Sequence, residues 1–327
     1  MRVSLPSLGL GAAAIGNLYR PMGDEDAVDT VAAALEAGIA YIDTAPHYGF
    51  GLSEKRLGEA LRRFDPARKI AVSTKVGRLL RPVEGGSSLR HGFAGAEPFE
   101  PVFDYSYDAV MRSFAESCDR LGRDHIDLLL AHDLGSVTHG EDHPAHYRAF
   151  LEGGYRAMRE LRDAGVVKAI GLGVNEWQIC QQAMGDAEFD LFLLAGRYTL
   201  LEQNALDSFL PACAARGIGI IVGGPYNSGI LAGGAHFNYE PAPAPIVERV
   251  RRLEVQCARF GVPLAAAALQ FPLAHPQIVS VIPGMAGRSQ VEDAIRLTRI
   301  AIPAGFWIAL REEGLLHPAA PTPEGRS

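Results

Sequence analysis

The chain has 327 residues, of which 48% are hydrophobic, so it is long enough to bury a large core. Its 31 basic and 38 acidic residues give a net charge of −7, which argues against binding to nucleic acid or to an anionic membrane surface. The four cysteines form no CxxC pair, which argues against a disulfide framework or a cysteine-built metal site and fits a reducing cytoplasm.

The N-terminal stretch MRVSLPSLGLGAAAIG faintly resembles a secretion signal, because an early arginine is followed by apolar and small residues. Pro6, Gly9 and Gly11 interrupt the apolar run, so we expect a cytoplasmic protein instead. No apolar run approaches the ~20 residues that a membrane-spanning helix needs, so no membrane association is expected.

Apolar runs of strand length alternate with amphipathic stretches of helix length along the chain. The predicted strands are 8–11, 39–44, 70–75, 126–132, 167–174, 191–198, 218–223 and 278–283. The predicted helices are 25–37, 53–63, 107–121, 155–164, 176–184, 205–216, 246–260 and 291–299. Strict alternation indicates a parallel sheet, and eight such units predict a (β/α)8 TIM barrel as a single domain over residues 1–327.

The segment at about residues 80–105 is rich in Gly and Pro and has no clear period. It predicts a long loop insertion, which would be either a functional lid or a mobile excursion without ligand contact. Phe93, Phe99 and Phe103 would give it an apolar underside.

Polar residues stand where predicted strands end. In a barrel of this type these ends converge on one mouth, where the active site lies. Asp43 ends the second strand and Tyr48 follows it, Lys75 ends the third strand, and His132 ends the fourth. An ammonium lowers the pKa of a nearby phenol, so Lys75, held by Asp43, would activate Tyr48. With His132 orienting the reacting oxygen, such a site moves a proton while a hydride is transferred at the carbon.

In order and strand position, these four residues resemble the catalytic tetrad of the aldo-keto reductases, and the resemblance covers nearly the whole chain. The stretches FDYSYDAVMRSFAESCDRLGRDHIDLLLAHD, LLAGRYTLLEQ, GGPYNSGILAG, LAAAALQFPLAHP and FWIALREEGLLHPAAPTP look most like the L-fucose and D-threo-aldose 1-dehydrogenase branch. Plant L-galactose dehydrogenases and pyridoxal 4-dehydrogenases also look related.

The resemblance implies NAD(P)-dependent oxidation of an aldose of the L-fucose, L-galactose or D-arabinose type. The reaction would convert C1 to the lactone, with Tyr48 as the general base. The alternatives are a pyridoxal 4-dehydrogenase, a reductase of small carbonyl compounds, and a catalytically silent cofactor-sensing subunit.

The resemblance also implies a cofactor site. Asn175 would hold the nicotinamide carboxamide, although it would equally serve to cap the helix that starts at Glu176. Val174 and Ala195 replace a serine and a glutamine that the family usually has there. Gly223 replaces the aromatic residue that commonly stacks on nicotinamide, a role that Tyr226 would take over. The expected cofactor contacts are Asn175, Gly223, Gly224, Pro225, Tyr226, Ser228, Gly229, Leu231, Pro283, Gly284 and Arg288.

The loop IPGMAGRSQVEDAI bears on the choice of cofactor. Gly284 and Gln290 stand where NADP-preferring members have a lysine and an arginine, and Arg288 is the only cation in the loop. NAD is therefore expected to be preferred, with NADP as the alternative.

The expected partner is a small-molecule sugar, contacted by His47, Asp133 and Trp177. In the alternative interpretation His47 is only a wall residue and Asp133 caps the following loop. The sequence gives no indication of the oligomeric state.

Two further motifs are not interpreted as functional sites. The stretch GLGAAA, residues 9–14, formally fits the dinucleotide fingerprint, but the next helix starts about ten residues later, so we expect it to form the first barrel strand and its loop. The histidines at 139, 143 and 146, with Asp142, lack regular ligand spacing, and no metal is expected.

Overall fold

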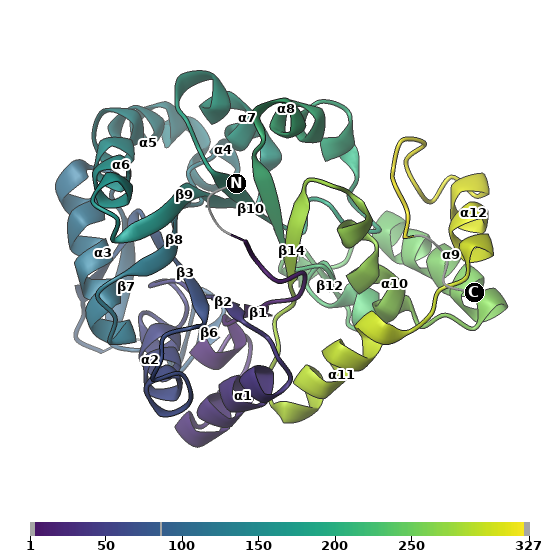
Figure 1. The fold of residues 1–327 in the computed structure, drawn as a ribbon, viewed down its shortest axis with the longest axis horizontal. Coiled ribbons are helices and arrows are strands. Elements are labelled where there is room, and N and C mark those ends of the chain that lie inside the picture. The colour runs from purple at the N-terminus through teal and green to yellow at the C-terminus, as the bar shows by residue number, and fades with distance from the viewer. Residues whose placement is uncertain (1–3, 86, 324–327) are drawn as a thin grey trace.

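The computed structural model describes residues 4–85 and 87–323. Eight parallel strands form one sheet in the order β1-β2-β3-β8-β9-β10-β11-β14. They are β1 (Leu10–Gly11), β2 (Tyr41–Asp43), β3 (Ala71–Val76), β8 (Ile126–His132), β9 (Val167–Val174), β10 (Leu191–Ala195), β11 (Gly219–Gly223) and β14 (Ile278–Ile282). Figure 1 shows helices arranged around the outside of this ring of strands.

The helices are α1 (Asp24–Glu36), α2 (Leu52–Phe64), α3 (Tyr107–Leu121), α4 (Ser136–His139), α5 (His143–Ala149), α6 (Tyr155–Asp163), α7 (Trp177–Asp186), α8 (Phe209–Arg216), α9 (Ala244–Phe260), α10 (Leu264–Gln270), α11 (Arg288–Arg299) and α12 (Ala304–Glu312). Each predicted helix matches one of these within a few residues. The short α4, α5 and α10 and the C-terminal α12 were not predicted, because a helix of two turns, or one that is apolar on most sides, gives no clear amphipathic period.

The ring is closed by the segments that flank its first and last strands. Leu8 forms a parallel bridge with Val281, and Gly11 forms one with Gly284. The Gly9 and Gly11 amides donate to the carbonyls of Val281 and Pro283 at 3.0 and 2.9 Å. The predicted (β/α)8 barrel is therefore confirmed, and the GLGAAA stretch forms its first strand and the start of the loop that follows.

Two apolar clusters surround the strands. The smaller one fills the barrel interior and contains Tyr41, Leu128, Leu130, Ala169, Leu191, Leu193, Ile221 and Ile282. The larger one lies between the sheet and the helices. Because successive strand residues point to opposite faces, the strands are apolar on both sides, as expected for a parallel sheet covered by helices.

The insertion at residues 80–105 is more regular than the sequence indicates. Strands β4 (Arg78–Pro82) and β7 (Phe99–Phe103) pair antiparallel over five residues, and β5 (Leu89–Arg90) pairs with β6 (Phe93–Ala94). The prediction of a segment without regular structure was therefore wrong. Its strands are short, and β7 is only partly buried, so no clean alternation of apolar and polar residues arises.

The insertion is tied to the loop between β1 and α1. Asn17 donates from Nδ2 to the Ala94 carbonyl at 2.9 Å, and its own carbonyl accepts from the Ala94 amide at 3.0 Å. The Tyr19 amide donates to the Gly92 carbonyl at 2.8 Å. These bonds hold Phe93, which is only 3% exposed, over the mouth of the barrel. A third antiparallel pair, β12 (His236–Phe237) with β13 (Glu240–Pro241), follows β11.

Within residues 4–85 and 87–323, no single helix is long and apolar enough to cross a bilayer. The stretches 244–260 and 264–274 would reach that length only together, across a bend of 103°.

Candidate active site

Lys75 is the centre of a hydrogen-bonded group at the C-terminal ends of β2 and β3. Its Nζ donates to Asp43 Oδ2 at 2.7 Å, to the Thr44 carbonyl at 2.8 Å and to Tyr48 Oη at 3.1 Å. The Lys75 and Asp43 side chains are each 2% exposed. Ser73 donates to the other carboxylate oxygen of Asp43 at 2.6 Å. The Asp43 carboxylate is thus held by the Ser73 hydroxyl on one side and by the Lys75 ammonium on the other. Asp43 in turn keeps Lys75 in contact with the Tyr48 hydroxyl.

The charges of this group are set by opposing effects. Burial alone would lower the pKa of Lys75, but the charges of Asp43 and Tyr48, and hydrogen bonds to them, outweigh it, so the pKa of Lys75 is raised. Lys75 therefore stays an ammonium. Burial raises the pKa of Tyr48, and the nearby Lys75 offsets only part of that increase. We expected Lys75 to lower this pKa; it acts in that direction, but the net direction is upward because the phenol is buried.

His132 lies beside the phenol, with its ring centroid 6.1 Å from that of Tyr48 and the two rings nearly perpendicular. Burial lowers the pKa of His132 well below its usual value, and Arg78 and Lys75 lower it further. The imidazole is therefore neutral. Its Nε2 lies 3.6 Å from Asp133 Oδ2, whereas Nδ1 is buried and has no hydrogen-bond partner among the described residues. Nε2 is thus the nitrogen placed to donate toward a ligand.

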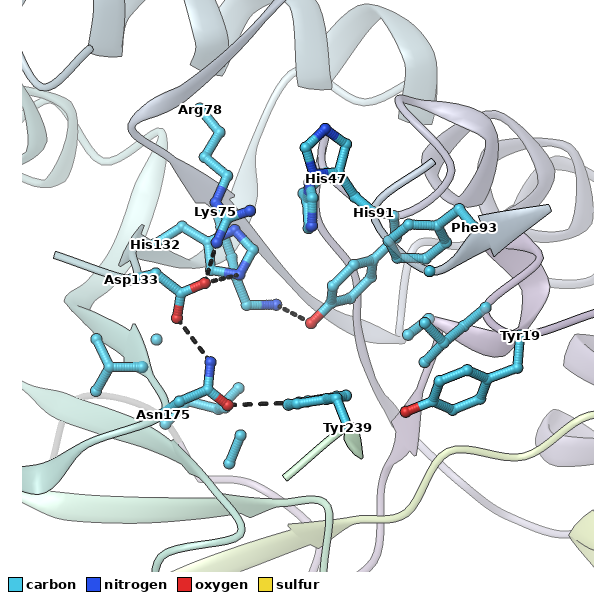
Figure 2. Close-up of a pocket in the computed structure, with 18 of the residues that line it drawn as sticks. Tyr19, His47, Lys75, Arg78, His91, Phe93, His132, Asp133, Asn175 and Tyr239 are labelled. Atoms are coloured by element: carbon cyan, nitrogen blue, oxygen red, sulfur yellow. Dashed lines mark hydrogen bonds and ion pairs between the residues drawn. The ribbon is translucent and has the colours of Figure 1, made fainter. Parts of the chain in front are cut away.

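These side chains line a cavity of about 520 Å³, here called the central cavity. Figure 2 shows Lys75, His132, Asp133 and Asn175 on one side of it, Phe93 and Tyr19 on the other, and Tyr239 joined to Asn175. His47 also lines it, and burial together with the Arg78 charge lowers the pKa of His47 to about 2. The cavity wall therefore holds two neutral imidazoles.

Asn175 and Asp133 are joined in the wall of this cavity. Asn175 donates from Nδ2 to Asp133 Oδ1 at 3.0 Å, and its Oδ1 accepts from Tyr239 Oη at 3.4 Å. Helix α7 has Glu176 at its N-cap, without a side-chain capping bond. Asn175 therefore faces the cavity and does not cap the helix, and Asp133 binds side chains in the wall.

A second cavity of about 480 Å³, here called the adjacent cleft, meets the central cavity at Tyr19, Tyr48 and Tyr239, which line both. Seven of the residues predicted to contact the cofactor line it: Gly223, Gly224, Pro225, Tyr226, Ser228, Gly229 and Gly284.

The glycines leave room for a ligand in this cleft. A Cβ placed on Gly284 would meet no atom outside its immediate neighbours closer than 4.0 Å, so it would project into the cleft. Such a glycine-lined cleft, which reaches Tyr48 at one end, fits an extended dinucleotide with its nicotinamide beside the phenol.

Four predicted contacts lie elsewhere. Leu231 is fully buried in the core, because an apolar side chain on a short helical turn packs inward. Pro283 contributes its carbonyl to barrel closure and does not line the adjacent cleft. Arg288 is paired with Asp29 and Glu36 of α1. Trp177, predicted to contact the sugar, packs against Phe209 with ring centroids 6.1 Å apart and does not line the central cavity.

Sequence reasoning missed several cavity residues, among them Arg78, Tyr19 and Tyr239. Arg78 lines the central cavity, and Tyr19 and Tyr239 stand where the two cavities meet. Arg78 follows Lys75 by three residues, so its cation beside a strand end is a signal that the sequence contains. Tyr19 and Tyr239 lie in loops at positive φ, of 66° and 68°, and no periodic pattern marks such positions.

The histidines after β8 form a cluster behind the site. The rings of His139 and His146 lie 4.1 Å apart, and His139 Nε2 is 2.9 Å from Tyr105 Oη. Among the described residues there is no group of three or more His, Cys, Asp or Glu side chains that is arranged to hold a metal ion.

Comparisons with protein families, with known sequences and with solved structures all point to the same family. The Aldo/keto reductase family profile matches residues 7–312. The chain is 45% identical to a pyridoxal 4-dehydrogenase of Microbacterium luteolum, over 96% of this chain and 95% of that protein. It is 40% identical to a D-threo-aldose 1-dehydrogenase of Pseudomonas sp, over 98% and 96%. Among solved structures, the holo form of an aldo-keto reductase from Bacillus halodurans superimposes with a TM-score of 0.74 at 22% identity, over 97% and 94%. The chain therefore belongs to the aldo/keto reductase family and is an NAD(P)-dependent oxidoreductase.

Proposed function

We propose that this enzyme oxidises a cyclic hemiacetal at its anomeric carbon to a lactone, with an aldose as the substrate and Tyr48 as the general base. The observation that carries the proposal is the contact of Lys75 Nζ with both Asp43 Oδ2 and Tyr48 Oη, at 2.7 and 3.1 Å, on the wall of a cavity. A buried ammonium against a phenol is the arrangement that makes a tyrosine able to exchange a proton.

Each residue of the tetrad has its own role in the proposed reaction. Nicotinamide, when bound, supplies the hydride acceptor. Tyr48 takes the proton of the C1 hydroxyl, and Lys75 stabilises the phenolate that this requires. Asp43 holds Lys75 in place. His132 is neutral, so its Nε2–H donates to the C1 oxygen and orients it without adding a charge.

The charge balance of the central cavity favours an uncharged substrate. Of the lysine and arginine side chains in its lining, Lys75 is paired with Asp43 and Arg78 with Asp133. A phosphorylated or carboxylated substrate would have to compete with these buried carboxylates for its cation, at a large cost in desolvation. A neutral sugar needs only hydrogen bonds, which His47, Asp133 and Asn175 offer.

Pyridoxal is the second candidate. It is favoured by the 45% identical relative that is a pyridoxal 4-dehydrogenase, and by the aromatic side chains Phe93, Tyr19 and Tyr239 in the cavity wall. Its aldehyde and neighbouring hydroxymethyl group also close to a cyclic hemiacetal, so the same proton and hydride transfers would give a lactone. A small-carbonyl reductase would use the same residues in reverse.

We further propose that NAD is the preferred cofactor. Arg288, the expected partner for a 2′-phosphate, donates to Asp29 at 2.8 Å and to Glu36 at 2.6 Å. Gln290 accepts from the Ala286 amide at 2.8 Å. The carboxylates neutralise the only arginine of that loop and would repel the additional phosphate of NADP.

The test is a spectrophotometric screen of the purified enzyme with NAD and NADP. The panel contains L-fucose, L-galactose, D-arabinose, their epimers, pyridoxal and simple alcohols. The proposal predicts the highest kcat/KM for one of these three sugars with NAD, and a lactone as the first product. If pyridoxal or a simple alcohol is oxidised far better than every sugar, the aldose assignment is wrong, while the roles of Tyr48 and Lys75 are unaffected.

A further inference from the structure

Arg78 is placed over the central cavity by the turn that leads out of the barrel. Gly77, between β3 and β4, has φ +97°, and a Cβ there would meet the Tyr105 ring at 2.3 Å. Only glycine fits this turn, which redirects the chain from the barrel strand into the insertion. The Arg78 guanidinium then lies over the ring of Phe103, 4.6 Å from its centroid, and the side chain is only 13% exposed.

Asp133 faces Arg78 from the end of β8. Its backbone has φ +48°, an unfavourable conformation for a residue with a Cβ. Tyr105 Oη donates to the carbonyls of His132 and Asp133, at 2.7 and 3.2 Å, and this holds the backbone in place. The carboxylate, 7% exposed, forms an ion pair with Arg78 through Oδ2 and accepts from Asn175 through Oδ1. Strain of this kind tends to persist where a side chain must be aimed at a functional site.

A buried ion pair is a poor device for stability alone, because taking two charges out of water costs about as much as their attraction returns. Arg78 and Asp133 both line the central cavity, and Asp133 Oδ2 is 3.6 Å from His132 Nε2. Figure 2 shows the three side chains converging on one wall. The pair is therefore next to the position where His132 would hold the reacting oxygen.

We propose that Arg78 and Asp133 form a specificity pair that recognises a hydroxyl group on the carbon next to the reacting carbon. This rests on the proposed function in taking Tyr48 and His132 as the groups that hold the reacting oxygen. Oxygens on neighbouring carbons of a sugar lie about one hydrogen-bond length apart. A group that accepts from His132 at one carbon therefore brings the next oxygen within reach of Arg78 and Asp133.

A hydroxyl both donates and accepts, so a guanidinium beside a carboxylate satisfies it completely. A substrate without that hydroxyl would leave both charged groups facing an apolar methyl or methylene. Sites built in this way discriminate strongly against the deoxy analogue. Hydrogen bonds to charged groups correspond to discrimination of roughly 10- to 100-fold in kcat/KM.

The test uses reduction with NADH of two aldehydes that differ only in this hydroxyl, glycolaldehyde and acetaldehyde. We expect the wild-type enzyme to prefer glycolaldehyde by roughly 10- to 100-fold in kcat/KM. In Arg78→Met that ratio should fall to near one, because kcat/KM for glycolaldehyde falls by a larger factor than kcat/KM for acetaldehyde. The double variant R78M/D133N, which removes both charges, should behave in the same way if Arg78→Met folds poorly.

Arg90→Met is the matched control. Arg90 lies in the same insertion over the ring of Phe50, at 4.7 Å from its centroid, and is 15% exposed. It donates to the carbonyls of Phe99 and Glu97 at 2.7 Å and does not line the central cavity. This variant should leave the ratio between the aldehydes unchanged, whatever it does to stability.

The proposal is overturned if the wild type shows no preference for glycolaldehyde, or reduces neither aldehyde. It is also overturned if Arg78→Met and R78M/D133N lower both aldehydes by the same factor, which a purely structural role would give. A failure of the proposed function is distinguishable, because the aldehyde ratio would then depend on Arg78 although no sugar is converted to a lactone.

Discussion

The most direct test of the chemistry is a double-mutant cycle on Tyr48 and Lys75. Tyr48→Phe removes only the hydroxyl, and Lys75 keeps its bonds to Asp43 and to the Thr44 carbonyl, so the fold should persist. Loss of a positioned proton-transfer group typically lowers turnover by about 10²–10⁴-fold, which corresponds to roughly 3–5 kcal/mol of barrier.

The second arm needs a compensated variant. Lys75→Met alone would leave the Asp43 carboxylate, 2% exposed, without its cation, and breaking a buried pair in this way typically costs about 3–5 kcal/mol of stability. D43N/K75M removes both charges and avoids that penalty. With no ammonium 3.1 Å from the phenol, turnover should still fall by a large factor, because nothing then opposes the effect of burial on Tyr48.

Because Lys75 acts through the phenol, the two losses should not add. The triple variant Y48F/D43N/K75M should be about as slow as Tyr48→Phe alone. The assay is kcat for the best substrate of the screen, with thermal melting of every variant as the control for folding. Turnover of Tyr48→Phe near that of wild type, or fully additive losses in a folded triple variant, would show that Tyr48 is not the base that Lys75 activates.

Two further predictions concern pH and the cofactor. Oxidation needs Tyr48 deprotonated, and burial raises its pKa, so log kcat/KM for oxidation should rise with a slope near +1 from about pH 6 to about pH 9. For reduction, kcat/KM should not fall toward the acidic end of that range, because His132 stays neutral there. A fall in kcat/KM for reduction near pH 6 would contradict a lowered pKa of His132. For the cofactor, the double variant D29N/E36Q should free Arg288 from its two carboxylates. The ratio of kcat/KM with NADP to kcat/KM with NAD should then rise by about tenfold. A variant in which a surface arginine is replaced by glutamine is the control. An unchanged ratio would show that these acids do not set the preference.

The fold and the tetrad were predictable because their signals are local. Strands β2, β3 and β8 each carry a polar residue at or next to their end, and the barrel brings these ends to one mouth. Asp43, Lys75 and His132 could therefore be placed together without knowing any distance between them. Gly38, Gly165 and Gly217 each stand between a helix and the next strand, and all three have positive φ, which is typical of a helix end.

The cavity wall was less predictable because it is built from contacts between loops. Arg288 is the clearest case, because its partners Asp29 and Glu36 lie on α1, at the other end of the chain. Trp177 follows Asn175 closely, so it was predicted to contact the sugar. Helix α7 starts at Trp177, however, and the Trp177 ring packs against Phe209. Sequence distance carries no information on such pairings, because the closed barrel brings α1 and α11 side by side.

The difference between the strand ends, which carry the proton-transfer group, and the loops, which form the cavity wall, explains how one barrel can accept different substrates. The proton-transfer group belongs to β2, β3 and the turn after β2, and barrel pairing holds Asp43 and Lys75 in register. The groups that would choose a substrate come from the insertion, from the loop after β8 and from the hairpin after β11, which meet only over the mouth. A change in Arg78 would alter what fits beside His132 without moving Lys75 relative to Tyr48. Under the proposed function, pyridoxal and an aldose would each present a hemiacetal carbon to Tyr48 and would differ in what surrounds that carbon, so relatives that carry either name are compatible with one chemistry.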